Sequence, residues 1–151
     1  MITLQPIAFV KNIRKTADDD NWGEIISEII LTEKFTEESL KGIDAFSHLE
    51  IIYYFDKVND SEIVAGSRHP RGNKNWPEVG IFAQRGKNRP NKVGATIVKL
   101  IEVKNKKLIV QGLDAIDNTP VLDIKPVMAE FLPLEKVRQP DWSHELMKKY
   151  W

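Results

Sequence analysis

Short apolar runs separated by turn-forming residues dominate the hydropathy pattern of this chain. The clearest run is residues 49–55 (LEIIYYF), whose β-branched and aromatic residues predict a strand buried on both faces. Residues 96–103 and 107–111 flank a polar stretch at 104–106 and predict a β-hairpin. Weaker runs predict further strands over residues 2–10, 79–83 and 121–124, whereas residues 24–31 fit either a strand or a helix.

Signals for helices are few. Thr36 precedes two glutamates and Gly42 follows them, which predicts a helix of one or two turns with Thr36 as its cap. Ser143 is expected to cap a second helix over residues 143–150. Strands at short spacing with turn residues between them predict an all-β fold, a small, mainly antiparallel β-barrel with a few short helices. No repeat or linker divides the chain, so we expect a single domain over residues 1–151.

The composition narrows the chemistry. The 151 residues include no cysteine, which excludes disulfides, thiolate metal sites and thiol nucleophiles. His48, His69 and His144 show no metal-binding spacing, so we expect no metal. No apolar run approaches the roughly 18 residues of a membrane span, and the first residues carry no signal pattern, so a soluble, cytoplasmic protein is expected.

Charge is unevenly distributed although the net charge is zero. Residues 66–92 hold seven basic side chains and one acidic, a net charge of +6, while residues 16–62 hold thirteen acidic and three basic side chains, a net charge of −10. Such segregation indicates a local anion site on a protein that is not basic overall. The alternative is that folding scatters these charges over a solvated surface.

The glycines exclude the common nucleotide-binding loops. No two of the eight are separated by a single residue, so the G-x-G-x-x-G dinucleotide loop is absent, and no G-x-x-x-x-G-K-[ST] sequence occurs. The strand–helix alternation of a doubly wound fold is missing as well. If this protein binds a nucleotide-like cofactor, it does so without a Rossmann loop.

Two segments are dense in chemistry-bearing residues. Residues 80–94 (GIFAQRGKNRPNKVG) join a strand to a constrained loop that holds Arg85 and Arg89, whose guanidinium groups suit carboxylates and phosphates. The alternative for this segment is a tight turn whose arginines pair with local acids. Residues 112–126 (GLDAIDNTPVLDIKP) carry three aspartates and Lys125 around a turn that can recognise adenine, ribose hydroxyls or an ammonium. Asp114 and Asp117 equally fit structural turn roles.

At these two segments the chain resembles the TsaA-like, or TrmO, family of S-adenosylmethionine-dependent methyltransferases. Members share a strand followed by Arg-x-x-x-Arg-Pro-Asn-x-x-Gly, here residues 85–94, and a later L-D-x-x-D-x-T-P-x-x-D-I-K-P stretch, here residues 113–126. The upstream FSHL element is present at residues 46–49, and residues 68–71 (RHPR) match the usual basic approach. The resemblance covers about two thirds of the chain.

The resemblance implies a compact β-barrel, commonly a homodimer, that binds S-adenosylmethionine. Characterised members methylate the exocyclic nitrogen of threonylcarbamoyladenosine beside the tRNA anticodon. Carried over by position, the cofactor site would be lined by Arg85, Arg89, Asn91, Gly94, Ala95, Leu113, Asp114, Ala115, Ile116 and Asp117. Lys125 is a weaker candidate for a catalytic residue near the substrate. The residues expected to bind the phosphates of the anticodon loop are Arg68, His69, Arg71, Lys87 and Lys92.

The chain departs from the family pattern in two places. Many members carry a Pro-Arg-Gln element soon after the first strand, where this chain reads TADDDNW at residues 16–22. After the central strand the family often has a histidine-containing pair, where this chain has Asp56 and Lys57. The methyl acceptor is therefore open between the tRNA nucleoside, another nucleoside and a small metabolite. A nucleotide- or RNA-binding barrel without turnover is the remaining alternative.

Overall fold

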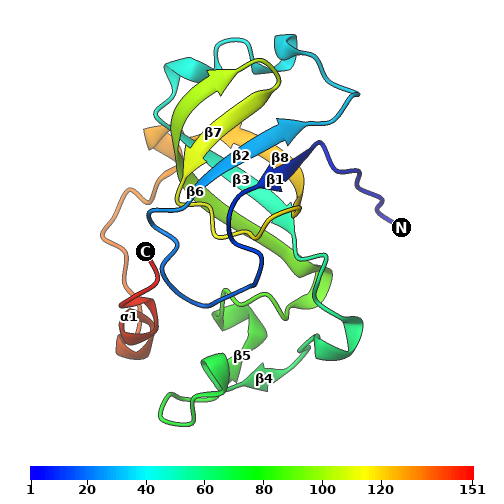
Figure 1. The fold of residues 1–151 in the computed structure, drawn as a ribbon. Helices are drawn as coiled ribbons and strands as arrows, with labels where there is room; N and C mark the ends of the chain where they lie inside the picture. The colour runs from blue at the N-terminus through cyan, green and yellow to red at the C-terminus, as the bar shows by residue number, and fades with distance from the viewer.

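Six antiparallel strands close into a barrel in the computed structural model, which describes residues 1–151 (Figure 1). The strand order is β1-β2-β7-β6-β3-β8, and β8 pairs with β1 to close the sheet. The barrel strands are β1 (Ala8–Lys11), β2 (Ile26–Leu31), β3 (His48–Tyr54), β6 (Val93–Lys104), β7 (Lys107–Gln111) and β8 (Pro120–Pro126). The predicted fold class is confirmed, and of the ambiguous run over residues 24–31, residues 26–31 form a strand rather than a helix.

Alternation along each strand fills the barrel interior. Leu49, Ile51 and Tyr53 on β3 point inward and are almost fully buried, while the residues between them are half-buried. The prediction that this strand is buried on both faces is wrong, because a barrel has one interior and the outer face of β3 has no second layer over it. The hairpin of β6 and β7 forms as predicted, with Lys104 paired to Lys107.

Two predicted strands are shorter than expected. The first strand begins at Ala8, and residues 2–6 of the predicted run lie outside it. Ala8 pairs with Leu31 and Val121, and β2 ends at Leu31, so residues 2–6 have no partner on the β2 side. On the other side β8 runs on to Pro126 without pairing with them, and Pro6 has no N–H to donate to a strand. In the predicted strand over residues 79–83, only β5 (Val79–Gly80) is extended. It pairs with β4 (Ser67–Arg68) in a small sheet outside the barrel.

The helices are short, and most are 3₁₀ turns. Thr36 makes no side-chain cap to the first 3₁₀ turn, η1 (Glu37–Leu40). The one α-helix, α1 (Asp141–Met147), begins two residues before the predicted Ser143 cap. Ser143 donates its hydroxyl to the carbonyl of Pro140 instead. No helix has the length and apolar character needed to cross a membrane. The 3₁₀ turns are η1 (Glu37–Leu40), η2 (Ile43–Ala45), η3 (Asp60–Glu62), η4 (Pro70–Gly72), η5 (Ile81–Ala83), η6 (Pro90–Lys92) and η7 (Ala129–Phe131).

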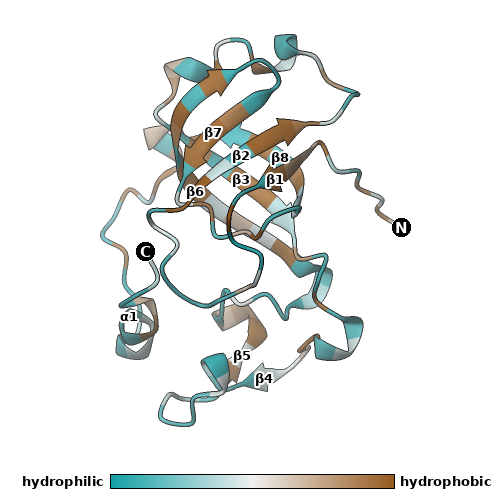
Figure 2. Ribbon diagram, viewed as in Figure 1, coloured by the Kyte–Doolittle hydropathy of each residue, from teal (hydrophilic) through white to brown (hydrophobic).

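The two ends of the barrel differ in what covers them. At one end, called here the mouth, β1, β3 and β7 finish while β2, β6 and β8 begin. Residues 67–80, which comprise β4, β5 and the chain between them and are called here the flap, lie beyond this end, as does α1 (Figure 1). At the other end, called here the apolar end, η1 and η2 pack between β2 and β3. Hydrophobic residues concentrate in the barrel strands, whereas α1 and much of the flap are hydrophilic (Figure 2).

Candidate functional site

A cluster of three hydroxyl groups around one carboxylate lies at the mouth. Asp114 follows β7, and its Oδ1 accepts a hydrogen bond of 2.9 Å from the Tyr53 hydroxyl at the end of β3. The hydroxyl of Thr96, near the start of β6, also donates to Oδ1. The hydroxyl of Tyr150, from the segment after α1, donates to Oδ2. Elements far apart in the sequence therefore converge on Asp114.

Both tyrosines act as proton donors in this cluster. Burial raises the pKa of Tyr53, and the negative charge of Asp114 raises it further. The same two causes, in the same order, raise the pKa of the Tyr150 hydroxyl. No lysine, arginine or histidine nitrogen lies within 4.0 Å of the Asp114 carboxylate. The carboxylate is thus held by neutral dipoles, and its charge has no cationic partner in the chain.

The arginine-bearing loop lies beside this cluster. Arg85 donates from Nη2 to the carbonyl oxygen of Ala95 at 2.7 Å, and Arg89 donates from Nη1 to the carbonyl oxygen of Gln84 at 2.8 Å. Asn91 has φ of 63° in η6, a left-handed backbone that asparagine tolerates well. Neither arginine pairs with a carboxylate, so the alternative of pairing with local acids is wrong. A guanidinium has five N–H donors, and most of those on Arg85 stay free of protein partners.

Gly94 makes room for the central tyrosine of the cluster. Gly94 and Tyr53 are register partners on β6 and β3. A Cβ on Gly94 would lie 2.6 Å from two ring carbons of Tyr53 and 3.0 Å from Phe55. A side chain at this position would push the Tyr53 ring, and hence the hydroxyl that holds Asp114. Glycine is required here by close packing rather than by a positive φ.

The arginine loop and the aspartate segment meet through two consecutive residues of β6. The carbonyl of Ala95 accepts from Arg85, and the side chain of Thr96 donates to Asp114. Both predicted segments therefore border the same mouth. Leu113 and Ala115 flank Asp114 and are buried in the barrel core. Ile116 is half-buried and accepts a hydrogen bond from the Thr119 hydroxyl.

Asp117 is bound to the chain itself. Its Oδ1 accepts from the backbone N–H of Asn12 at 2.9 Å, and its Oδ2 pairs with Lys15 Nζ at 2.6 Å. The Lys15 hydrogen bond lowers the pKa of the Asp117 carboxyl, and the Asn12 hydrogen bond adds to this effect. These contacts fasten the segment before β8 to the loop after β1.

The residues expected to bind RNA phosphates differ in how far their charge is neutralised. Arg71 pairs with Asp20 at 3.0 Å, and Lys92 pairs with Asp60 at 2.6 Å, which raises the pKa of the Lys92 ammonium. Arg68 contacts only uncharged groups, including Gln84 Oε1 at 3.3 Å. The side chain of His69 contacts the carbonyl of Trp76, and Lys87 has no acidic partner within 4.0 Å. Among residues 66–92, the positive charge that no acid neutralises thus resides on Arg68, Lys74, Arg85, Lys87 and Arg89.

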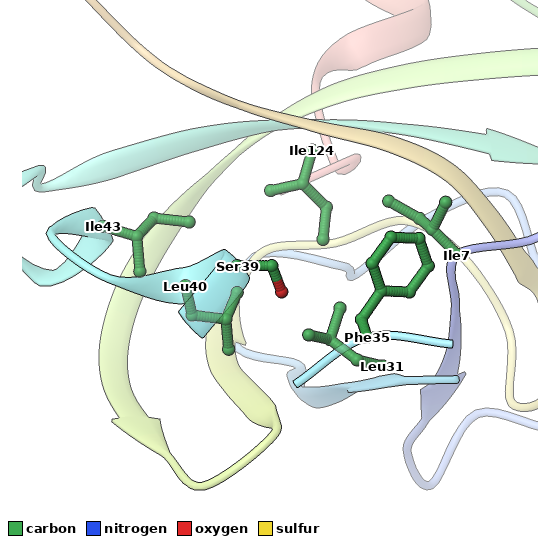
Figure 3. Close-up of a pocket in the computed structure, with 7 residues that line it drawn as sticks. All are labelled: Ile7, Leu31, Phe35, Ser39, Leu40, Ile43 and Ile124. Carbon is green, nitrogen blue, oxygen red and sulfur yellow. The ribbon is translucent and has the colours of Figure 1, made fainter. Parts of the chain in front are cut away.

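Lys125 is not brought together with the other predicted residues. It lies near the end of β8, which reaches the apolar end, and it pairs with Asp123 at 2.8 Å. This contact raises the pKa of the Lys125 ammonium. The neighbouring Ile124 lines an apolar pocket of about 130 Å³ (Figure 3), which is remote from Asp114 along the barrel axis. The remaining residues around this pocket are Ile7, Leu31, Phe35, Ser39, Leu40 and Ile43.

Sequence reasoning missed the three residues that hold Asp114. Tyr53 and Thr96 lie on predicted strands, and strand alternation with the β3–β6 pairing would have placed both side chains inside the barrel. Tyr150 carried no such signal, because it lies 36 residues after Asp114 and outside any strand. Its place at the mouth follows only from the path of the chain after α1.

Comparison with known proteins identifies a family model and several relatives that this chain resembles. The model of the family described as tRNA-methyltransferase O N-terminal domain matches residues 17–131. A human tRNA (adenine(37)-N6)-methyltransferase is 38% identical over 104 residues, which are 69% of this chain and 23% of that protein. An S-adenosyl-L-methionine-binding protein of Archaeoglobus fulgidus is 32% identical over 131 residues, which are 84% of this chain and 90% of that protein. The chain thus spans about a quarter of the human relative and most of the archaeal one.

Solved structures with the same fold are also known. A crystal structure of TrmO superimposes with a TM-score of 0.75 at 23% identity, covering 92% of this chain and 63% of that chain. A crystal structure of TrmO from Pseudomonas aeruginosa gives a TM-score of 0.73 at 24% identity, covering 91% of this chain and 61% of that chain. At these identities the likeness concerns the fold of the barrel.

Proposed function

This chain belongs to the family of the tRNA-methyltransferase O N-terminal domain, and from that premise we propose that it transfers a methyl group from S-adenosylmethionine to a nucleoside of tRNA. The observation that carries the proposal is the meeting of Arg85 and Asp114 at one barrel mouth through Ala95 and Thr96. The names of the human and archaeal relatives supply the activity and the cofactor that the proposal adopts.

The donor set at the mouth fits S-adenosylmethionine. Its methionine end carries a carboxylate and an ammonium, and its ribose carries hydroxyls. Arg85 and Arg89 offer guanidinium N–H groups without acidic partners, which suit the carboxylate. Asp114 offers an anionic acceptor without a cationic partner, which suits the ammonium or a ribose hydroxyl. When bound, the cofactor supplies an activated methyl group on a sulfonium centre.

The chain contributes alignment and a dry surrounding rather than a covalent intermediate. Tyr53 and Thr96 fix the direction of the Asp114 carboxylate, and the buried barrel core beneath them excludes water from that side. Holding a methyl donor and acceptor in line can supply about 7–11 kcal/mol of barrier reduction. Neutralisation of charge during transfer is favoured where water is excluded. Lys125 has no part in this scheme because it lies toward the apolar end.

We propose as acceptor the exocyclic nitrogen of threonylcarbamoyladenosine next to the tRNA anticodon. The transfer would release S-adenosylhomocysteine, and the proton of the acceptor N–H would pass to solvent water. The basic region at the mouth supports an RNA substrate, since Arg68, Lys87 and Arg89 hold charge that no acid in the chain neutralises. Phosphates of an anticodon loop would contact this region, and the unstacked loop base would reach the mouth. An enzyme with this acceptor is expected to work in the cytoplasm.

We further propose that the chain forms a homodimer. Phe9 on β1 and Ile30 on β2 are register partners on the outer face of the barrel, where they are 42% and 37% exposed. Burial of this pair against a second copy would remove apolar surface from water, which favours association. Sedimentation of the protein and of Ile30→Glu tests this: a dimer that the substitution splits supports the proposal, whereas a monomeric parent protein refutes it.

The cofactor is tested by calorimetry with S-adenosylmethionine. Arg89→Ala should weaken binding about ten- to a hundredfold, since a lost charge-assisted pair is worth about 1.5–3 kcal/mol. Arg89→Lys keeps the charge and should recover only part of the affinity, because an ammonium lacks the planar fork. Lys104→Ala at the apolar end is the control and should bind like the parent protein. Absence of binding by the parent protein would refute the proposed cofactor.

The acceptor is tested by nucleoside mass spectrometry. Transfer RNA from a strain lacking the gene should lose the methylated threonylcarbamoyl nucleoside, and the purified protein with S-adenosylmethionine should restore it. An unchanged nucleoside profile, together with measured cofactor binding, would indicate another acceptor. The two measurements therefore separate a wrong substrate from a wrong cofactor.

A further inference from the structure

The segment after β8 returns to the mouth and ends on the Asp114 cluster. Residues 141–151, called here the strap, comprise α1 and the four residues that follow it. The carbonyls of Lys149 and Tyr150 accept from the backbone N–H groups of Asn21 and Trp22 at 2.9 and 2.8 Å. This pairing directs the Tyr150 hydroxyl to Asp114 Oδ2. The strap thus takes the side of the carboxylate that Tyr53 and Thr96 leave free.

The strap is also attached to the flap. Trp76, between η4 and β5, donates from Nε1 to Glu145 Oε2 of α1 at 2.8 Å. Arg71 of the flap in turn pairs with Asp20, next to the residues that pair with the strap. The strap, the flap and the loop before β2 therefore form one connected cover over the mouth. In Figure 1, α1 and the flap lie on the same side of the barrel.

The contacts of the strap are exposed along α1, whereas Tyr150 is half-buried and Trp151 packs closely against Gly23. Helix α1 contains no buried residue, and residues 129–141 leading to it are all exposed. Segments with few buried apolar contacts and solvent-exposed hydrogen bonds open locally at small cost in free energy. The barrel beneath, by contrast, is fixed by its closed sheet and buried core. The strap can therefore detach while the barrel stays folded.

Tyr150 and a cationic ligand would compete for the same carboxylate oxygen. A neutral hydroxyl forms a weaker hydrogen bond with a carboxylate than a cationic donor does. Burial and the charge of Asp114 raise the pKa of the Tyr150 hydroxyl, while the nearby charges of Arg71 and, to a smaller extent, of Arg85 lower it. Tyr150 therefore lies close to Asp114 and Arg85, two of the residues that we assign to the cofactor.

We propose that the strap is an autoinhibitory element, in which Tyr150 occupies the place of the cofactor at Asp114 and leaves when the cofactor binds. This inference rests on the proposed function, since it takes S-adenosylmethionine as the ligand of the mouth. It assigns the strap a role that the barrel alone does not supply, because release of Tyr150 sets the apparent affinity for the cofactor.

Calorimetry of the full chain with S-adenosylmethionine tests the competition. Tyr150→Phe removes one hydroxyl and should lower the dissociation constant about fivefold, the equivalent of one hydrogen bond. Trp76→Phe removes the hydrogen bond between the flap and Glu145 of the strap and does not alter the contacts of Asp114. It should lower the dissociation constant by less than Tyr150→Phe does. The control Tyr54→Phe makes the same chemical change on the outer side of β3 and should leave the constant unchanged.

Amide exchange measured by mass spectrometry gives a second readout. Adding S-adenosylmethionine to the parent protein should speed exchange in residues 141–151, because the strap leaves the mouth. Unchanged or weaker binding by Tyr150→Phe, or slower exchange of the strap with cofactor, would overturn the proposal while leaving the cofactor assignment intact. Absence of binding by the parent protein and both variants would instead refute the proposed function, and the competition with it.

Discussion

The mouth and the apolar end of the barrel are built from the same six strands but divide stability and chemistry between them. At the apolar end, Leu40 of η1 is buried and packs with Phe35 and Ile43 against the core. At the mouth, a carboxylate and arginines contact neutral polar groups and retain their charge. The difference shows that one end can carry unpaired charge because the other end and the core supply the apolar contacts that hold the barrel.

Residues with a left-handed backbone are concentrated at the mouth rather than at the apolar end. The non-glycine residues with positive φ are Asn21, Arg71, Asn91, Lys92, Asn105 and Asn118. Only Asn105, in the turn between β6 and β7, lies at the apolar end. A left-handed backbone costs free energy for most residues and persists where the surroundings fix it. Its concentration in the loops of the mouth is typical of loops whose shape serves binding.

The largest expected effect is a loss of stability caused by a substitution at the apolar end, which leaves the residues of the mouth unchanged. Leu40→Ala removes a side chain that is 6% exposed from beside the apolar pocket, and it should lower the free energy of unfolding by about 2–4 kcal/mol. Urea unfolding measures this change. Leu134→Ala, at a position 92% exposed, is the matched control and should have little effect. An equal loss in both variants would show that the apolar end contributes no special stability.

A smaller loss of stability, but a larger loss of binding, is expected at the mouth. Gly94→Ala places a methyl group against the Tyr53 ring, which should cost about 1–3 kcal/mol of stability through overpacking. Displacement of Tyr53 should also weaken S-adenosylmethionine binding about tenfold in calorimetry. Gly66→Ala is the control, since a Cβ there meets nothing within 4 Å and its φ is not positive. Tight binding by Gly94→Ala would separate the Tyr53 position from the cofactor site.

The smallest effect depends on pH. The pKa of Asp117 is lowered in the folded protein, so its contribution to stability is present above the unfolded pKa of about 3.9 and is lost as pH falls through the lower folded value. Asp117→Asn should therefore cost about 0.5–1 kcal/mol in urea unfolding at pH 7, and less at pH 2. The control Asp44→Asn, at an exposed site, should leave the free energy of unfolding unchanged at both pH values. A difference that persists undiminished at low pH would contradict the assigned role of the Lys15–Asp117 pair.

Alternation and turn chemistry predicted much of the barrel because these signals are local. The hairpin of β6 and β7 follows from residues 96–111 alone, and the absence of a glycine loop correctly excluded a Rossmann fold. The first strand was predicted too long because residues 2–6 look like a strand, yet β2 ends at Leu31 and β8 does not pair with them. Whether a compatible segment pairs is decided by its neighbours in the fold.

The candidate site was predictable only in part, for the same reason. The arginine loop and the aspartate segment could be identified as motifs, and the structure places Arg85 and Asp114 at one mouth. The segregated charge overstated the free positive surface, since Arg71 and Lys92 find acids brought close by folding. The contact of Tyr150 with Asp114 had no sequence signature, because it depends on where the exposed chain after β8 returns.

The flap lies outside the closed barrel, in a separate two-stranded sheet of β4 and β5. Insertions, deletions or exchanges in the flap can therefore accumulate without exposing a sheet edge to aggregation. On the proposed function, a change of flap would alter the surface offered to the acceptor, while the residues that we assign to the cofactor on β6 and after β7 would remain in place. Grafting a foreign flap onto this barrel is accordingly a direct route to redirecting its substrate choice.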